Sequence, residues 1–306
     1  MLRRLGARLF IDHASELCVP DADGPGVTRL ADHAVCGEGG GIAWIGPRSE
    51  RPAASEGAHT YDAAGGAVLP ALVDCHTHLV FGGDRVLDFA RRASGMTYAE
   101  IAAEGGGILT TVEATRRASF DALLDGTRAR LEHRAQHGIW TTEIKSGYGL
   151  DTETELKMLR AISAAAEGWA GTVVPTACIG HAIDPDATTD ADRGAFVRRT
   201  IDQTLPAVTA EFPGIAIDAY CERGAWSVAE CVELFDRAQH AGHPVRVHAD
   251  QFNPLGLVPE AVARGYRSVD HLEATTPDDL HALAASDTFG VVLPCAGFHT
   301  DGRYGD

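Results

Sequence analysis

From residue 67 onward, short apolar runs alternate with segments whose apolar residues recur every three or four positions. The recurring pattern predicts amphipathic helices over 120–131, over 228–235, and over 156–162 after an N-capping Asp151. The apolar runs predict buried strands, which cover 67–73, 139–144, 172–176, 215–220, 245–247, 268–269 and 289–293. Alternating strands and helices indicate parallel strands joined by right-handed crossovers.

Residues 1–66 follow a different pattern. Apolar runs at 9–11, 27–30 and 42–45 lie between clusters of glycine, proline and aspartate, which is typical of short strands joined by turns. We therefore expect two domains, a small β lobe at 1–66 and a strand-and-helix domain at 67–306.

Polar side chains follow six of the predicted strands. In chain order, these side chains are His76 with His78, Tyr148, His181, Cys221 with Glu222, His248, and His271. In a (β/α)₈ barrel these carboxyl ends converge on one mouth, where catalysis takes place. In an open doubly wound sheet they would gather at one switch point. The spread over many strand ends predicts an α/β fold of the TIM-like barrel type. The barrel is incomplete, because about seven strands are found and the eighth is missing.

Charge and cysteine usage exclude several classes of protein. The formal net charge is -17, from 43 acidic and 26 basic residues, and such a surface repels nucleic acid. The seven cysteines are scattered without a C-x-x-C pair, which argues against a disulfide framework and indicates a cytoplasmic location. Because no apolar run approaches 18 residues, we expect no membrane span, and the interrupted apolar stretch at the start argues against a signal peptide.

The strongest chemical signal is the pair His76 and His78, directly after the first strand of the barrel. Residues i and i+2 of an extended segment point the same way, so two imidazoles can share one cation. His248 is a third candidate ligand and His271 a fourth polar group at the mouth. Each histidine alone is more typical of a hydrogen-bonded core residue, but the set at successive strand ends favours a hydrolytic metal site.

Three long motifs carry a family resemblance: L-P-A-L-V-D-C-H-T-H-L-V-F-G-G-D-R at 69–85, G-G-G-I-L-T-T-V at 105–112, and E-I-K-S-G-Y-G-L at 143–150. With the histidine-ended strands, the chain resembles the amidohydrolase superfamily and, within it, the imidazolonepropionase family. The H-x-H pair marks only the superfamily, whereas F-G-G-x-R, the glycine triplet and E-I-K-S-G-Y-G are specific to the family. The lobe at 1–66 fits as well, because members carry a small β-sandwich beside the barrel.

The resemblance implies hydrolytic ring opening of 4-imidazolone-5-propanoate to N-formimidoyl-L-glutamate, the third step of histidine degradation. It implies one metal ion, Zn or Fe, on His76, His78 and His248, a small-molecule substrate, and a homodimer. By motif match, the residues in contact with substrate are Arg85, Tyr148, His181 and Gln251. His271 is then the catalytic residue beside the scissile carbonyl, where an imidazole can polarise the carbonyl or move protons. The planar fork of Arg85 suits the propionate carboxylate.

Two residues limit the mechanism. Some relatives carry glutamate where this chain has Gln251, and an amide cannot accept a proton near neutral pH. Activation of water therefore falls to the metal, to His271 or to another carboxylate. Some amidohydrolases bridge two metals with a carbamylated lysine after the fourth strand, but Lys145 follows the second strand. We therefore predict one metal, with Lys145 either structural or an electrostatic residue of the mouth.

The sequence departs from the family after residue 293. The family's fourth metal ligand is an aspartate after the eighth strand, whereas the tail at 298–306 is polar and rich in glycine. Asp301 and Asp306 are poor substitutes for that ligand. We expect a C-terminally shortened enzyme with low or no activity. Two alternatives stay open: a related amidohydrolase acting on formimidoylglutamate or another cyclic amide or amidine, and an inactive ligand-binding remnant.

Overall fold

The computed structural model describes residues 8–22, 24, 26–97, 100–101, 104–300 and 302–304. The chain divides into two compact units. The first comprises Met1–Val73 with Gly138–Trp140, and the second comprises Asp74–His137 with Thr141–Asp306. The domain boundary expected at residue 66 stays a prediction.

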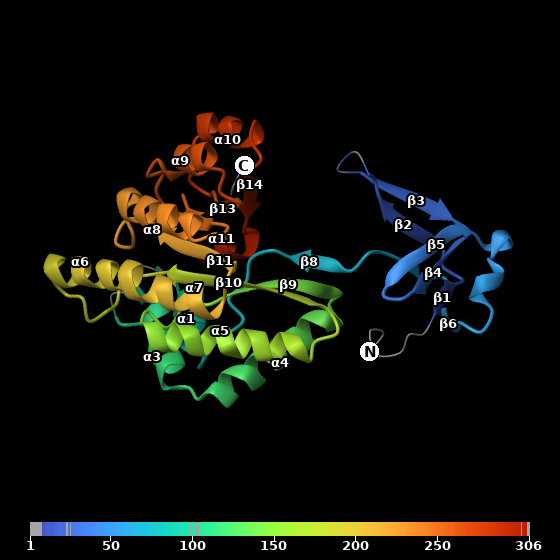
Figure 1. The fold of residues 1–306 in the computed structure, drawn as a ribbon, viewed down its shortest axis with the longest axis horizontal. Coiled ribbons are helices and arrows are strands. Elements are labelled where there is room, and N and C mark those ends of the chain that lie inside the picture. Colours follow the sequence, from blue (N-terminus) through green and yellow to red (C-terminus); the bar gives the residue numbers. More distant parts are fainter. Residues whose placement is uncertain are drawn as a thin grey trace. The chain divides into compact units, whose positions relative to one another are not determined.

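The first unit contains two small sheets (Figure 1), one in the order β5-β4-β1-β6 and the other β3-β2-β7. Their strands are β1 Leu9–Asp12, β2 Glu16–Pro20, β3 Val27–Ala31, β4 His33–Glu38, β5 Gly41–Pro47, β6 His59–Asp62 and β7 Ala67–Val68, with short helices η2 Arg48–Glu50 and η3 Ala53–Ser55. A small core contains Phe10, Ala34 and Cys36, with Trp44 packed against it. The apolar runs predicted β1, β3 and β5. They missed β6, for example, because its residues are all exposed and carry no apolar pattern.

A seven-stranded sheet has the order β14-β13-β12-β11-β10-β9-β8, and all of it lies in the second unit except for the first two residues of β8 and of β9. The strands are β8 Leu72–Asp74, β9 Ile139–Lys145, β10 Thr172–Gly180, β11 Ala216–Cys221, β12 Arg246–Ala249, β13 Ser268–His271 and β14 Phe289–Val292. The pairs from β9 to β14 are parallel. This order of strands confirms the predicted incomplete barrel, with β8 and β14 as its two edges.

The first predicted strand, 67–73, is wrong in one respect, because the structure divides it in two. Ala67–Val68 forms β7 and pairs with β2 of the small lobe, whereas Leu72–Asp74 forms β8 of the barrel sheet. Pro70 lies between the two pieces and has no backbone N–H to give to a ladder, which explains the interruption.

Helices connect the barrel strands (Figure 1). They are α1 Val86–Ala93, α3 Ile108–Arg117, α4 Phe120–Gln136, α5 Thr152–Glu167, α6 Asp190–Arg199, the π-helical η4 Thr200–Thr204, α7 Leu205–Glu211, α8 Val228–His240, α9 Leu257–Arg264, α10 Pro277–Ala284 and α11 Pro294–Thr300. The predicted cap of α5 is confirmed, because the Asp151 side chain accepts a hydrogen bond of 2.8 Å from the Thr154 N–H. None of the helices in the described ranges is long and apolar enough to cross a membrane.

After β14 the chain turns into α11, and no eighth strand follows among the described residues. At this edge of the sheet, Phe289 is 73% exposed and Val292 is 53% exposed. Asp301 and Asp306 lie outside the described residues. The sheet therefore ends at β14 with an apolar edge that meets solvent in this structure.

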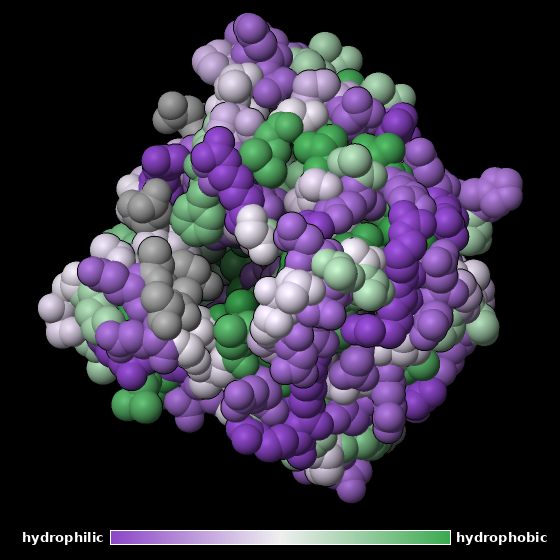
Figure 2. Space-filling model, turned by 90° about the vertical axis from the view of Figure 1, so that its left-hand side faces the viewer, coloured by the Kyte–Doolittle hydropathy of each residue, from purple (hydrophilic) through white to green (hydrophobic). Residues whose placement is uncertain are grey.

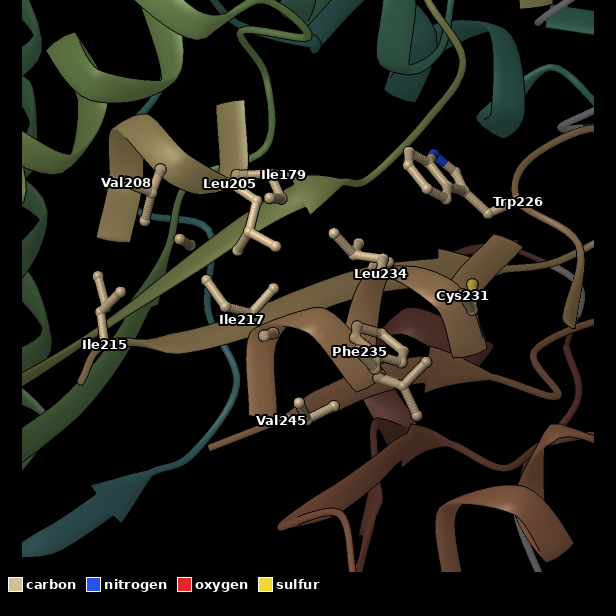
Figure 3. Close-up of a cluster of buried hydrophobic side chains, with 14 of the residues drawn as sticks. Ile179, Leu205, Val208, Ile215, Ile217, Trp226, Cys231, Leu234, Phe235 and Val245 are labelled. Carbon is tan, nitrogen blue, oxygen red and sulfur yellow. The ribbon is translucent and has the colours of Figure 1, made fainter. Parts of the chain in front are cut away.

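A cluster of buried side chains joins the sheet to the helices that cover it (Figure 3). Ile217 of β11 and Val245, just before β12, lie among Leu205 of α7 and Leu234 and Phe235 of α8. Three of these residues, Ile217, Leu234 and Phe235, have no exposed surface. The barrel strands are therefore held in place by packing on their outer face.

We predict that Leu234→Ala lowers the free energy of unfolding by about 2–5 kcal/mol, because it opens a cavity in a dry core. Leu87→Ala is the matched control, since Leu87 is 75% exposed and its truncation should change stability by about 0.5 kcal/mol or less. Denaturant unfolding followed by circular dichroism measures both values. Equal destabilisation by the two substitutions would contradict this description of the core.

Candidate active site

One cavity of about 630 Å³ is lined by the eight residues that the sequence analysis assigned to metal, substrate or catalysis. They are His76, His78, Arg85, Tyr148, His181, His248, Gln251 and His271. Figure 2 shows a hollow near the centre of one face of the molecule. Since these residues follow strands far apart in the sequence, only the curled sheet brings them to one place.

Three histidines converge in this cavity. Nε2 of His78 lies 3.2 Å from Nε2 of His248, and the rings of His76 and His248 have their centroids 4.5 Å apart. One ligand atom from each of His76, His78 and His248 lies within 4.8 Å of the others. Such a set of imidazole nitrogens can hold one cation of the Zn or Fe type.

Buried carboxylates orient two of the three rings. His76 donates from Nδ1 to Asp270 Oδ2 over 2.6 Å, and His248 donates from Nδ1 to Asp218 Oδ1 over 3.0 Å. His78 donates from Nδ1 to the carbonyl oxygen of Ser146 over 3.3 Å. With Nδ1 protonated in each ring, the lone pair is on Nε2, which is the atom left for a metal ion.

Burial keeps these imidazoles neutral. Desolvation lowers the pKa of His76 to about 4 and that of His248 to about 3. Burial also lowers the pKa of His78 well below its usual value, helped by its neighbours His181 and His248. Metal ions bind the neutral form of imidazole, so the ionisation state at neutral pH suits a metal site.

His271 and His181 lie beside this group. The ring centroid of His271 is 5.5 Å from that of His248, and His181 stacks on His78 at 4.3 Å. Strand alternation alone would point His271 away from the side to which Asp270 points. The φ angles of +93° at His271 and +70° at Leu272 break that alternation at the end of β13. Positive φ in residues with a Cβ is strained backbone, which concentrates at functional sites.

Arg85 enters the cavity from the loop that follows two glycines. A Cβ on Gly82 would lie 2.7 Å from the carbonyl oxygen of Ala114, so this loop can approach α3 only with glycine there. Arg85 Nε donates to Asp88 Oδ2 over 2.5 Å, and the same oxygen accepts from the Gly107 N–H over 2.9 Å. The ion pair uses Nε, and within the described residues the Nη groups of Arg85 make no polar contact, so they can meet a ligand. Asp88 therefore ties Arg85 to the glycine triplet.

A buried glutamate that the sequence analysis missed shapes the loop of Tyr148. Glu155 accepts from the N–H groups of Gly147, Gly149 and Leu150 over 3.0, 2.7 and 3.0 Å. Gly147 has φ of +123°, and a Cβ there would lie 2.9 Å from His181 Cβ. The ring of Tyr148 consequently lies 5.2 Å from His181 and 5.4 Å from His78. A glutamate four residues into a helix gives no sequence signal for this role.

Gln251 is held by a second residue that sequence analysis missed. The hydroxyl of Tyr220, at the end of β11, donates to Gln251 Oε1 over 2.7 Å, and Tyr220 also lines the cavity. Glu222 accepts from the N–H groups of Phe252 and Asn253 over 2.9 and 3.1 Å, which fixes the loop after Gln251. Polar residues at the end of β11 and directly after it thus support the loop after β12.

Comparison with solved structures shows the fold that this chain shares. A 5-methylcytosine deaminase from Klebsiella pneumoniae superposes with a TM-score of 0.63 at 17% identity, covering 96% of this chain and 68% of that chain. An amidohydrolase from an environmental sample of the Sargasso Sea gives 0.60 at 17% identity, covering 95% of this chain and 65% of that chain. The fold is that of the amidohydrolase superfamily. No protein-family model matches the chain.

Sequence relatives identify the family. The imidazolonepropionase of Pseudomonas entomophila (strain L48) is 44% identical over 267 residues, which are 87% of this chain and 66% of the relative. Those of Paracoccus denitrificans (strain Pd 1222) and Ruegeria sp. (strain TM1040) are 40% and 42% identical, covering 94% and 95% of this chain and 71% of each relative. The chain belongs to the imidazolonepropionase family, which confirms the resemblance. It spans between 66% and 71% of the length of these relatives.

The depressed histidine pKa values predict a pH dependence of stability in the metal-free protein. In the unfolded chain these imidazoles take up protons below about pH 6.5. In the folded chain His76 does so only near pH 4, and His181 and His248 only near pH 3, because they are buried. Between these folded-state values and about pH 6.5, the unfolded state therefore binds more protons than the folded state. Lowering the pH from about 6.5 to about 4.5 consequently destabilises the fold.

Each histidine contributes a slope of at most about 1.4 kcal/mol per pH unit. Urea unfolding of the metal-stripped protein at several pH values measures the total slope, and His181→Gln should reduce it by one histidine's share. A free energy of unfolding that does not change across this interval would contradict the burial of neutral imidazoles.

Proposed function

We propose that the chain hydrolyses 4-imidazolone-5-propanoate to N-formimidoyl-L-glutamate with one metal ion held by His76, His78 and His248. The single observation that supports this most is the cavity, which all eight candidate site residues line together. The names of the relatives agree with it, since those from Pseudomonas entomophila and Paracoccus denitrificans are imidazolonepropionases. The proposal also includes the cytoplasmic location and the homodimer expected from the sequence.

The histidine set suits a metal ion by its chemistry. Three neutral imidazoles converge, and carboxylates or a carbonyl group hold their Nδ1 atoms. Nitrogen donors of this kind favour Zn or Fe over Mg or Ca. When bound, such an ion acts as a Lewis acid and lowers the pKa of water toward neutrality.

The remaining residues hold the substrate and move protons. Arg85 presents its guanidinium to the propionate carboxylate, while Tyr148, His181 and Gln251 contact the imidazolone ring. In the reaction, the oxygen of water bonds to the ring carbonyl carbon, the C–N bond breaks, and the departing nitrogen takes a proton. His271 is the residue placed to carry that proton, because Gln251 is an amide and cannot act as a base.

The activity is tested with the purified chain supplied with zinc or iron(II) and 4-imidazolone-5-propanoate. We expect about one metal ion per chain and consumption of the imidazolone above the background without enzyme. His78→Asn should abolish both, since it removes a convergent imidazole. His137→Gln, on an exposed histidine at the end of α4, should leave both unchanged.

The same assay separates the alternatives. Turnover slower than that of the relative from Pseudomonas entomophila would agree with the expected loss of activity, and equal turnover would refute that loss. Hydrolysis of formimidoylglutamate in place of the imidazolone would favour the related amidohydrolase. Binding of substrate without hydrolysis would favour the inactive remnant and would contradict the proposed function.

The role of Arg85 predicts a loss of affinity more than of chemistry. Arg85→Met should raise KM by about 10- to 100-fold with a smaller change in kcat, since a charge-assisted hydrogen bond far from the scissile bond is lost. Arg91→Met is the matched control, because Arg91 also pairs with Asp88, over 3.8 Å, but does not line the cavity. An unchanged KM in Arg85→Met would assign this arginine to structure alone.

A further inference from the structure

Beneath the three histidines lies a layer of buried charges. Glu143 and Lys145 of β9, Asp218 of β11 and Asp270 of β13 are each at most 3% exposed. Arg246 of β12 adds a second cation with a side chain that is 14% exposed. Bulky apolar side chains usually fill the interior of such a barrel. Because burying charges is costly, a layer of five calls for an explanation.

Lys145 is at the centre of this layer. Its Nζ lies 2.6 Å from Asp218 Oδ2, 2.9 Å from Glu143 Oε1 and 3.4 Å from Asp270 Oδ2. Arg246 lies further out, 3.3 Å from Asp270 and 3.7 Å from Glu143. One ammonium group thus contacts three carboxylates that come from three different strands.

Two of these carboxylates are the ones that hold the histidines. Asp218 contacts Lys145 with one oxygen and accepts from His248 with the other. Asp270 Oδ2 faces both Lys145 and His76. Lys145 does not line the cavity. Only Asp218 lies between Lys145 and His248, and only Asp270 lies between Lys145 and His76.

We propose that Lys145 is a positioning residue for the metal site. Its ammonium group anchors Asp218 and Asp270, so that these carboxylates accept from Nδ1 of His248 and His76 and direct both Nε2 atoms toward one point. A hydrogen bond to a ring orients that ring only when the acceptor itself is held still. This inference rests on the metal site of the proposed function but not on the reaction or its substrate.

The chain provides its own matched control, since Lys145 and Lys157 are its only lysines. Lys157 donates to the carbonyl oxygens of Arg116 and Ala118 over 3.1 and 2.9 Å at the end of α3, away from the cavity. The test is titration of the metal-stripped protein with zinc against a chelating competitor. Lys145→Met should weaken zinc binding by about 10- to 100-fold, and Lys157→Met should leave it within about threefold of the wild type.

A double variant separates positioning from simple charge balance. Glu143 contacts Lys145 with Oε1 and hydrogen-bonds to no histidine ring of the described residues, and its Oε2 accepts from the Thr77 N–H over 3.2 Å, a bond that the amide oxygen of a glutamine can keep. Glu143→Gln combined with Lys145→Met therefore restores the net charge of the layer while an acceptor for Thr77 remains. We expect the double variant to regain thermal stability while its zinc affinity stays at least about tenfold weaker than that of the wild type. Wild-type zinc affinity in either folded Lys145→Met protein would overturn the proposal.

A measurement on the wild type covers the case in which Lys145→Met does not fold. Long-range ¹H–¹⁵N spectra of the metal-free protein report which ring nitrogen of each histidine carries the proton, and His76→Gln and His248→Gln identify the two signals. Protonation at Nδ1 in both rings supports the proposal, and protonation at Nε2 overturns it. A chain that passes these tests without hydrolysing the imidazolone would overturn the proposed function and leave this inference standing.

Discussion

The site depends on two buried hydrogen bonds, from His76 to Asp270 and from His248 to Asp218. Each imidazole is buried and neutral, so its orientation and tautomer are set by the acceptor at Nδ1 rather than by solvent. The acceptors are charged and need a counter-charge of their own, which Lys145 supplies from β9 and Arg246 from β12. The histidines that line the cavity are thus hydrogen-bonded to a network of buried ion pairs inside the barrel.

Acidic side chains position other parts of the cavity as well. Asp88 ties Arg85 to the glycine triplet, Glu155 closes the loop of Tyr148, and Glu222 fixes the loop after Gln251. Part of the acidic excess of this chain is therefore used inside the fold to satisfy backbone N–H groups and guanidinium ions. The net charge of -17 argues against a nucleic-acid partner as an expectation from the sequence, but it does not reveal this internal use of acidic side chains.

Local pattern predicted much of the barrel. The apolar runs located the strands from β9 to β14, and Asp151 marked the start of α5. Prediction failed where the pattern was weak or ambiguous. The exposed β6 has no apolar alternation, and Pro70 divides a continuous apolar run between two sheets. The carboxylate partners of the histidines also escaped prediction, since His76 and Asp270 are 194 positions apart and no local period connects them.

The sequence by itself determined the alternation of strands and helices from β9 to β14, the family, and which polar residues follow these strands, because periodicity and motifs are properties of neighbouring residues. Only the tertiary structure decided that these residues share one cavity, that their imidazoles are neutral, that Tyr220 holds Gln251, and that Lys145 is buried among carboxylates. These properties depend on which strands pair and on how much water the folded chain excludes. Both follow from contacts between distant parts of the chain.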